Sequence, residues 1–342
     1  MASMTDRTAV LILGEVTKGR LSASTRELIG GGRDLADTLR SKLTLAVLGD
    51  DLKATGEEAI ACGADVVLLA ENPSLREYQA DAYLQILERA VDHINPEILL
   101  MGHTSLGRDF APRLAYRLKT GLSMDCVELS IDPGSGLLRM TRPVYGCKAL
   151  SVMVCRTKPQ MATARLGAMR PLDPDATRSG RVAAIDADID RSLIRAQVIE
   201  RVDPYEEGVA LEDARVIVCG GRGMGSGESF GLLEELAQLL GGAVGASRPP
   251  CDSGWVPSTR QIGLTGKILR PDLYIAVAIS GSSQHMAGCS DSRRIVAINK
   301  DPQANIFSVA HYGVVGDYRE IVPPFMQRVK QILGVRERDD DT

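Results

Sequence analysis

The sequence predicts an α/β fold made of two domains. The chain has 342 residues, whereas a single hydrophobic core stops growing near about 250–300 residues. Hydrophobic residues form 44% of the chain but aromatic residues only 4%, and there are 34 glycines. This combination is typical of α/β domains, in which strands rich in Val, Ile and Leu alternate with helices and glycine serves the tight turns.

Apolar runs alternate with helical patterns in the first half of the chain. The runs are short and continuous, as in strands that are buried on both faces of a parallel sheet. Between them, apolar residues recur near helical spacing, as at Leu75, Tyr78, Ala82 and Leu87. We therefore expect strands at 9–13, 43–48, 65–70 and 97–101, and helices at 24–39 and 75–93.

The pattern changes after Leu122. Residues 124–165 hold short extended runs interrupted by the turn sequence Asp132-Pro133-Gly134, and they predict an antiparallel extension of the first domain. The next stretch is rich in Pro, Asp, Arg and Ala and predicts a linker or wrapping segment. These boundaries give a first domain at 1–205, with the wrapping segment at 168–205, a second domain at 206–333 and a charged tail at 334–342.

A second αβ pattern begins near residue 214, and polar residues follow each of its predicted strands. Ligands of open parallel sheets bind beyond the carboxyl ends of the strands. Five successive polar strand ends favour a ligand site at one rim over ordinary turn chemistry. The predicted strands are 214–219, 243–247, 272–279, 294–298 and 312–316, and they are followed by Gly220 to Gly223, Ser247 and Arg248, Ser280 to His285, Asn299 and Lys300, and Gly316 and Asp317.

Two of these loops carry a specific pattern. GGRGMGSGESF follows a predicted strand, but its glycines do not form G-x-G-x-x-G, the dinucleotide fingerprint. The loop is either a turn with Ser226 capping the next helix or a close backbone approach to a cofactor with Arg222 beside it. The segment from Ser280 to His285 is either a plain cluster of helix-capping residues or a loop whose N–H and hydroxyl groups suit a pyrophosphate.

The composition and the spacing of Cys and His argue against a nucleic-acid-binding, metal-binding, secreted or membrane-spanning protein. The net charge is −4 and aromatic residues are few, so we expect no nucleic-acid partner. The seven cysteines form no C-x-x-C pair and the four histidines do not cluster with them, so we expect reduced thiols and no metal site. The start MASMTDRTAV lacks a signal-peptide pattern, and no apolar run approaches a membrane span. We therefore expect a cytoplasmic protein without membrane insertion.

Long segments of the second domain resemble one protein family. ARVIVCGGRGMGSGESF, the run from GGAVGASRPP to SGSSQHMAG, and IVAINKDPQANIFSVAHYGVVGDY are similar to the FAD domain of the electron transfer flavoprotein α subunit. TRPVYGCKALSVMVC and RDFAPRLAYRL resemble the first domain of that family. The resemblance implies an N-terminal α/β domain that packs on a β subunit, followed by a Rossmann-like (DHS-like) FAD-binding domain.

The resemblance also implies roles for individual residues. Thr265 would lie near flavin N5, His285 near the N1–C2=O edge and Arg248 against the isoalloxazine ring, where a His or Arg cation would stabilise the anion formed by one-electron reduction. Asn299 and Asp317 would hold the adenosine half, and the Ser280 loop the diphosphate. Leu264 stands where the family usually has Gln, and Cys289 where Met is common. The implied FAD contacts are Arg222, Ser247, Arg248, Gln261, Ile262, Gly263, Leu264, Thr265, Ser280, Gly281, Ser282, Ser283, Gln284, His285, Asn299, Asp317 and Tyr318.

The implied function is that of an electron carrier and not of a substrate-converting enzyme. The chain and its β subunit would pass electrons from an acyl-CoA dehydrogenase, as in fatty acid β-oxidation, to an acceptor such as a quinone oxidoreductase. One alternative within the family is a bifurcating, NADH-dependent complex with a second flavin in the β subunit. An alternative from another class is a non-redox nucleotide-binding regulatory module, since parallel α/β sheets bind many nucleotides.

Overall fold

A computed structural model describes residues 8–17, 19–145, 149–200, 209–211 and 214–334. The chain divides into two compact units, Met1–Val202 and Asp203–Thr342. Each is described by itself. The expected boundary at 205/206 and the charged tail beyond Gly334 lie outside the described residues.

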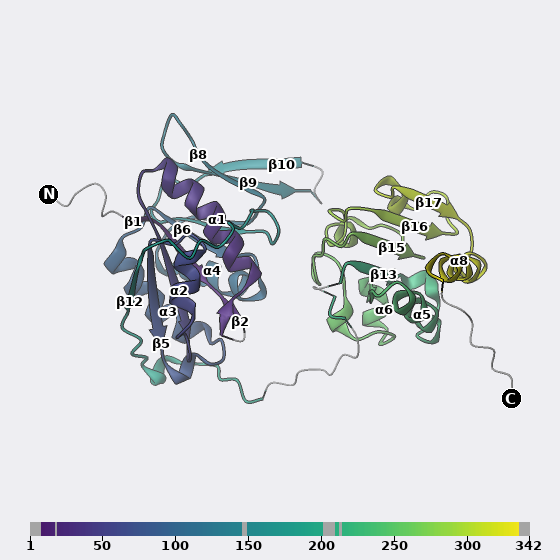
Figure 1. The fold of residues 1–342 in the computed structure, drawn as a ribbon, viewed down its shortest axis with the longest axis horizontal. Coiled ribbons are helices and arrows are strands. Elements are labelled where there is room, and N and C mark those ends of the chain that lie inside the picture. Colours follow the sequence, from purple (N-terminus) through teal and green to yellow (C-terminus); the bar gives the residue numbers. More distant parts are fainter. Residues whose placement is uncertain (1–7, 18, 146–148, 201–208, 212–213, 335–342) are drawn as a thin grey trace. The chain divides into compact units, whose positions relative to one another are not determined.

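The first unit is built on a seven-stranded sheet in the order β12-β5-β4-β1-β6-β11-β7 (Figure 1). Every adjacent pair in this sheet is parallel. The four strands expected in the first half of the chain all belong to it. The strands are β1 (Thr8–Gly14), β4 (Lys42–Gly49), β5 (Val66–Glu71), β6 (Ile98–Gly102), β7 (Leu122–Cys126), β11 (Gln160–Ala164) and β12 (Arg181–Ala184).

Helices cover both faces of this sheet. Along β1, Val10 and Ile12 join the core beneath α1 and α2, whereas Leu11 and Leu13 join the core beneath α3 and α4. Because both faces are covered, the strands are apolar at nearly every position instead of at alternate ones. The helices are α1 (Ala23–Thr38), α2 (Thr55–Ala61), α3 (Ala80–Ile94) and α4 (Ser105–Arg117), and a 3₁₀ turn, η2 (Pro73–Leu75), precedes α3.

Two details of the first unit differ from expectation. The helix expected at 75–93 begins only at Ala80, because Gln79 is extended and the apolar Leu75 belongs to the separate turn η2. The antiparallel extension exists as β8 (Glu128–Ile131), β9 (Leu138–Val144) and β10 (Ala149–Val154), in the order β10-β9-β8. However, β7 and β11, from the same 124–165 region, join the parallel sheet, where β11 is buried at every position between β6 and β7. A two-stranded ribbon, β2 (Val16–Thr17) with β3 (Arg20–Leu21), completes the unit.

The segment after Ala164 runs back across the first unit. Its strand β12 pairs with β5 and becomes the edge of the sheet. Beyond β12, the Asn72 side chain donates to the Ala187 carbonyl at 2.8 Å, and Arg195 forms an ion pair with Asp81 of α3 at 2.8 Å. A short 3₁₀ turn, η3 (Arg191–Leu193), lies between these contacts. The segment is therefore held beside η2 and α3 by polar contacts and by Ile189, which is buried in the same core as α3.

The second unit is a five-stranded parallel sheet in the order β14-β13-β15-β16-β17 (Figure 1). All five strands predicted from the sequence are present, and the two-domain α/β fold class is confirmed. The strands are β13 (Val216–Gly220), β14 (Ala243–Ala246), β15 (Leu273–Val277), β16 (Ile295–Asn299) and β17 (Tyr312–Val315).

Helices α5 and α8 pack beside each other on one face of this sheet. The expected capping of α5 by Ser226 is wrong. The helix begins at Gly231 with Phe230 at its N-cap, and the Ser226 hydroxyl lies 3.1 Å from the Ser229 hydroxyl instead, because a 3₁₀ turn intervenes. The helices are α5 (Gly231–Leu239), α6 (Arg248–Asp252), α7 (Ser283–Met286) and α8 (Tyr318–Leu333), with 3₁₀ turns η4 (Arg222–Met224), η5 (Glu228–Phe230), η6 (Ser258–Arg260) and η7 (Asn305–Ser308).

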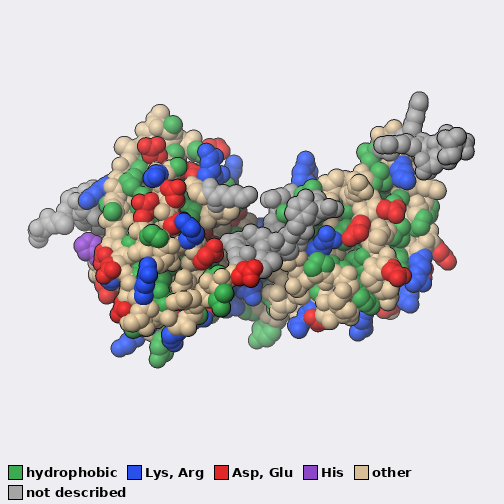
Figure 2. Space-filling model, turned by 90° about the horizontal axis from the view of Figure 1, so that it is seen from below, with side chains coloured by type: hydrophobic (Ala, Val, Ile, Leu, Met, Phe, Trp, Pro, Cys, Tyr) green, Lys and Arg blue, Asp and Glu red, His purple; other side chains and the backbone are tan. Residues whose placement is uncertain are grey.

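The surface carries both signs of charge. On the face seen in Figure 2, Lys and Arg side chains are interspersed with Asp and Glu side chains on each unit. Among the residues described, no helix has the length and apolar character needed to cross a bilayer.

A buried ion pair gives a test of the first unit. Arg165 donates to Asp125 through two bonds of 2.8 and 2.7 Å, and their side chains are only 8% and 14% exposed. We expect Asp125→Asn to destabilise this unit by about 3 kcal/mol, because it leaves a buried guanidinium without its counter-charge. Asn tolerates the left-handed backbone of Asp125, whose φ is 63°.

Urea unfolding followed by far-UV circular dichroism measures this loss. The single tryptophan, Trp255, lies in the second unit and supplies an internal reference by fluorescence. The control is Glu88→Gln in the more exposed Arg117–Glu88 pair, for which we expect about 1 kcal/mol or less. Equal losses in the two variants would contradict the argument.

Candidate functional site

The carboxyl ends of all five strands of the second unit form one rim, and backbone hydrogen bonds join neighbouring strand ends. The Gly221 amide donates to the Val277 carbonyl at 2.9 Å, and the Ala278 amide to the Ile298 carbonyl at 2.8 Å. Likewise, Ser247 N donates to Gly220 O at 3.0 Å and Gly316 N to Asn299 O at 3.0 Å. The loops that the sequence singled out are thus adjacent in space.

At the centre of the rim, two backbones approach closely. A Cβ added to Gly221 would lie 2.2 Å from the Ala278 carbonyl oxygen, so only glycine fits there. Ala278 itself has φ 55°, a left-handed conformation that costs a residue with a side chain roughly 1–2 kcal/mol. Strained residues of this kind cluster at ligand sites.

The loop after β15 presents hydroxyl and amide groups to solvent. Gly281 makes its sharp turn with φ 80°, and an added Cβ would lie 2.1 Å from the Ile306 amide nitrogen. Ser280, Ser282 and Gln284 are exposed. The Ser282 hydroxyl also caps α7 by accepting from the His285 amide at 3.4 Å. The loop is therefore held in place by its backbone while its polar side chains stay accessible.

A second loop, residues 261–265, packs against α7. Its Leu264 amide donates to the Gln284 carbonyl at 2.7 Å, and the Gln261 amide group donates to the Thr265 hydroxyl at 2.9 Å. Ile262 is anchored to β14 through the Ala246 carbonyl at 2.9 Å. Leu264 and Thr265 remain exposed at the tip of the loop. Two segments that the sequence assigned to one ligand are thus in direct contact.

His285 lies beneath these two loops with both ring nitrogens engaged. Nδ1 is 3.1 Å from the Ile262 carbonyl oxygen, and Nε2 is 3.0 Å from the Tyr274 hydroxyl. Because a carbonyl only accepts, Nδ1 carries the proton and Nε2 accepts from the tyrosine. Burial lowers the pKa of His285 to about 4. Burial therefore favours the neutral form of this ring over a cation, and the exposed cations at the strand ends of the rim include Arg222, Arg248 and Lys300.

Tyr274 is a site residue that the sequence analysis missed. It is fully buried in β15, where it is the largest of the fully buried side chains. A hydroxyl buried this deeply needs partners, which here include His285. The available signal was a single tyrosine inside the otherwise aliphatic strand LYIAV.

Several other residues predicted to contact FAD form hydrogen bonds or ion pairs with neighbouring residues of the chain. The Asn299 amide group donates to the Ile279 carbonyl at 2.8 Å, and its oxygen accepts from the Asp301 amide at 3.0 Å. Asp317 caps α8, and the buried Tyr318 hydroxyl donates to the Met224 carbonyl at 2.9 Å. Arg248 is 65% exposed and lies 3.2 Å from Asp252. These residues shape the rim, and Arg248 faces solvent.

Comparison with known proteins identifies the family of the chain. A sequence profile described as the electron transfer flavoprotein domain matches residues 10–190, and one described as the electron transfer flavoprotein FAD-binding domain matches residues 210–290. The chain belongs to the electron transfer flavoprotein family. The "electron transfer flavoprotein subunit alpha" of Thermoanaerobacterium thermosaccharolyticum is 42% identical, over 96% of this chain and 100% of that protein.

Other members of the family give the same picture. The Bacillus subtilis protein of the same name is 42% identical over 94% of this chain and 98% of its own length. The "acryloyl-CoA reductase electron transfer subunit beta" of Anaerotignum propionicum is 36% identical over 94% of this chain and 95% of its own length. The family, the FAD cofactor and the α-subunit role in electron transfer that the sequence predicted are confirmed.

The rim of this flavoprotein fits FAD. Gly221 and Gly281 let the loops of the rim approach neighbouring backbone where a side chain would collide, and the exposed hydroxyls of Ser280 and Ser282 are suited to a diphosphate. Arg222 and Arg248 offer positive charge to an anionic ring. The flavin supplies the redox chemistry when bound, and the chain supplies binding, orientation and charge.

The Tyr274–His285 bond can be tested by stability. We expect Tyr274→Phe to destabilise the second unit by about 2 kcal/mol, because it leaves Nε2 of a buried imidazole without a donor. Urea unfolding followed by Trp255 fluorescence measures the change. The control, Tyr312→Phe, alters a ring that is 65% exposed and should have almost no effect. If Tyr274→Phe and Tyr312→Phe gave the same unfolding curve, this prediction would be contradicted.

Acid should weaken the second unit through His285. The pKa of this group is 6.5 in the unfolded chain and about 4 in the folded one. Its contribution is complete above pH 6.5 and is lost as the pH falls towards 4, because the unfolded state takes up the proton first. We expect about 3 kcal/mol of loss between pH 7 and pH 4. In His285→Gln this part of the pH dependence should vanish, and an unchanged slope would refute the assignment.

Proposed function

We propose that FAD lies across the carboxyl rim of the second unit and that the chain carries electrons as one half of a heterodimer with an electron transfer flavoprotein β subunit. The observation that carries this proposal is the direct contact between the 261–265 loop and α7, which joins two segments expected at the flavin. The exposed Thr265 and Leu264 face the space beside the ring, and the Ser280–Ser283 loop holds the diphosphate.

Charge at the rim sets the tendency of the flavin to accept an electron. Because His285 is neutral, Arg248 is the residue that we assign to stabilising negative charge on the reduced ring. His285 acts as a fixed neutral dipole that orients the Ile262 carbonyl and hence the 261–265 loop. The loss of the usual Gln at Leu264 removes one amide from this environment.

We assign an acyl-CoA dehydrogenase as the donor, a quinone oxidoreductase as the type of acceptor, and the cytoplasm as the compartment. The naming of a relative after acryloyl-CoA reductase supports a CoA-thioester enzyme as partner, although that name describes the relative alone. A second flavin in the β subunit, with NADH as donor, defines the bifurcating alternative.

Reconstitution tests this function. The chain is co-expressed with its β subunit, the flavin in the purified complex is counted, and an acyl-CoA dehydrogenase with its substrate is added. One FAD held by the α subunit and bleaching of the flavin absorbance upon addition are expected. Two flavins with NADH oxidation would select the bifurcating alternative. A colourless complex that does not take up added FAD would overturn the proposal.

A glycine substitution tests the location of the cofactor. We expect Gly281→Ala to lower the FAD content of the purified complex at least tenfold, because the added methyl group collides with the backbone of Ile306 and displaces the diphosphate loop. Absorbance at the flavin band relative to protein measures the content. Gly241→Ala is the matched control, because Gly241 also has a left-handed φ, 62°, but nothing lies within 4 Å of its added Cβ. Full FAD content in Gly281→Ala would refute the placement.

A further inference from the structure

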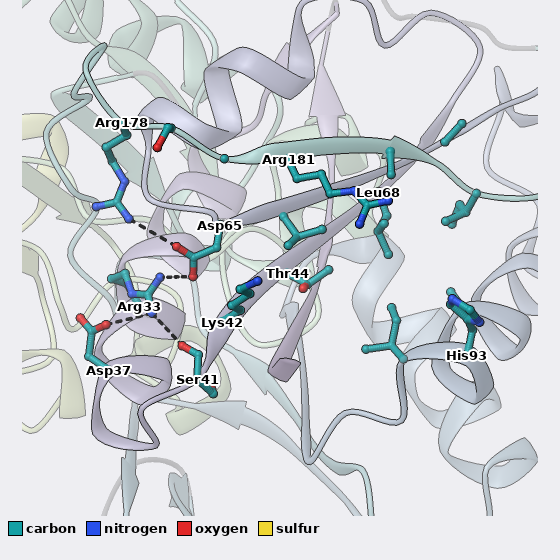
Figure 3. A pocket seen from close by; sticks show the side chains of 18 of the residues that line it. Arg33, Asp37, Ser41, Lys42, Thr44, Asp65, Leu68, His93, Arg178 and Arg181 are labelled. Atoms are coloured by element: carbon teal, nitrogen blue, oxygen red, sulfur yellow. Dashed lines mark hydrogen bonds and ion pairs between the residues drawn. The ribbon is translucent and has the colours of Figure 1, made fainter. Parts of the chain in front are cut away.

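One cluster of charged side chains outside the rim holds elements of the first unit together. It lines a cavity at the amino ends of β4, β5 and β12. Arg33 lies 2.8 Å from Asp37 and 2.5 Å from Asp65, and Arg178 lies 3.8 Å from Asp65 (Figure 3). The Asp65 carboxylate also accepts from the Leu43 amide at 2.8 Å. Asp65 thus ties α1, β4 and the returning segment together, which is a structural role.

At the rim, the loop that begins at Gln261 and has Thr265 at its tip is closed by its own backbone. The Lys267 amide donates to the Gln261 carbonyl at 2.8 Å, and the Gly263 amide donates to the Lys267 carbonyl at 3.1 Å. A Cβ added to Gly266 would lie 2.3 Å from the Gln261 carbonyl oxygen, so the chain can close in this way only with glycine there. The backbone positions of Gln261 and Thr265 are therefore fixed relative to each other.

Within this closed loop, the Gln261 side chain reaches the hydroxyl of Thr265. Gln261 Nε2 donates to Thr265 Oγ1 at 2.9 Å. An amide nitrogen only donates, so the hydroxyl spends a lone pair on this bond and keeps its proton for an acceptor elsewhere. Thr265 is exposed, so that proton can point out of the loop. Gln261 thereby makes the Thr265 hydroxyl a donor towards whatever acceptor lies beside the loop.

We propose that Gln261 is a positioning residue, which directs the Thr265 hydroxyl as a donor to an acceptor atom of the flavin ring. This inference rests on the function proposed above, which places Thr265 beside the ring. A hydrogen bond donated to the ring strengthens when the ring gains negative charge, because bonds to charged acceptors are the stronger ones. Gln261 therefore favours uptake of an electron by the flavin, and it does so through Thr265.

The test measures the midpoint potential for the first electron in the FAD-loaded heterodimer. Gln261→Met keeps the length of the side chain but has no donor, so the equilibrium constant for uptake of that electron should fall by about threefold or more. Thr265→Val should lower it at least as far. The variant carrying both changes should match Thr265→Val alone, because Gln261 acts through the hydroxyl. Gln238→Met, at an exposed glutamine on α5, is the control and should leave the constant unchanged.

A second variant, Gln261→Glu, reverses the bond. A carboxylate only accepts, so it draws the Thr265 proton inward and leaves the hydroxyl to face the ring with a lone pair. Its negative charge disfavours reduction as well, so its effect is compared with and without the Thr265 hydroxyl. We expect the constant to fall about threefold further when the hydroxyl is present than in the Thr265→Val background.

The outcomes separate this inference from the function on which it rests. Unchanged potentials in both Gln261 variants, or equal effects of those variants with and without the Thr265 hydroxyl, would overturn the role of Gln261. A heterodimer without FAD in its unaltered form would overturn the proposed function instead. Urea unfolding followed by Trp255 fluorescence shows that each variant is folded at the temperature of the titration.

Discussion

The junction between the 261–265 loop and helix α7 is the constraint on which the shape of the cofactor rim depends. Two bonds make it: the Leu264 amide to the Gln284 carbonyl, and His285 Nδ1 to the Ile262 carbonyl. The second bond is directional because Tyr274 holds the opposite nitrogen of the ring. A buried aromatic pair inside β15 and α7 thereby sets the position of a loop that is otherwise exposed at its tip.

The first unit is also a parallel sheet with helices, but its sheet is buried on both faces. The central strands β1, β4 and β6 are therefore apolar at nearly every position. Charged groups that do enter the interior are paired, as Arg165 and Asp125 are.

The sequence predicted the strands best where burial on both faces makes them continuous apolar runs. It misassigned β7 and β11, because LSMDC and QMATA mix small, polar and apolar residues although β11 is buried. The apolar spacing predicted that Leu75 lies in a helix, but Leu75 belongs to the 3₁₀ turn η2. The 3₁₀ turn η5 lies between Ser226 and α5, so Ser226 does not cap that helix. At the site, resemblance to the family pointed to the 261–265 loop and to the loop from Ser280 to His285. It did not reveal the protonation of His285 or the part of Tyr274, because these follow from tertiary contacts between residues 23 and 11 positions apart.

Locking His285 in its neutral form has a consequence for the cell. An imidazole that titrates in the physiological range changes the charge of its surroundings whenever the pH moves through its pKa. With its pKa near 4, this ring keeps one charge state across the whole range in which cells live. His285 therefore adds no pH-dependent charge to the second unit within that range.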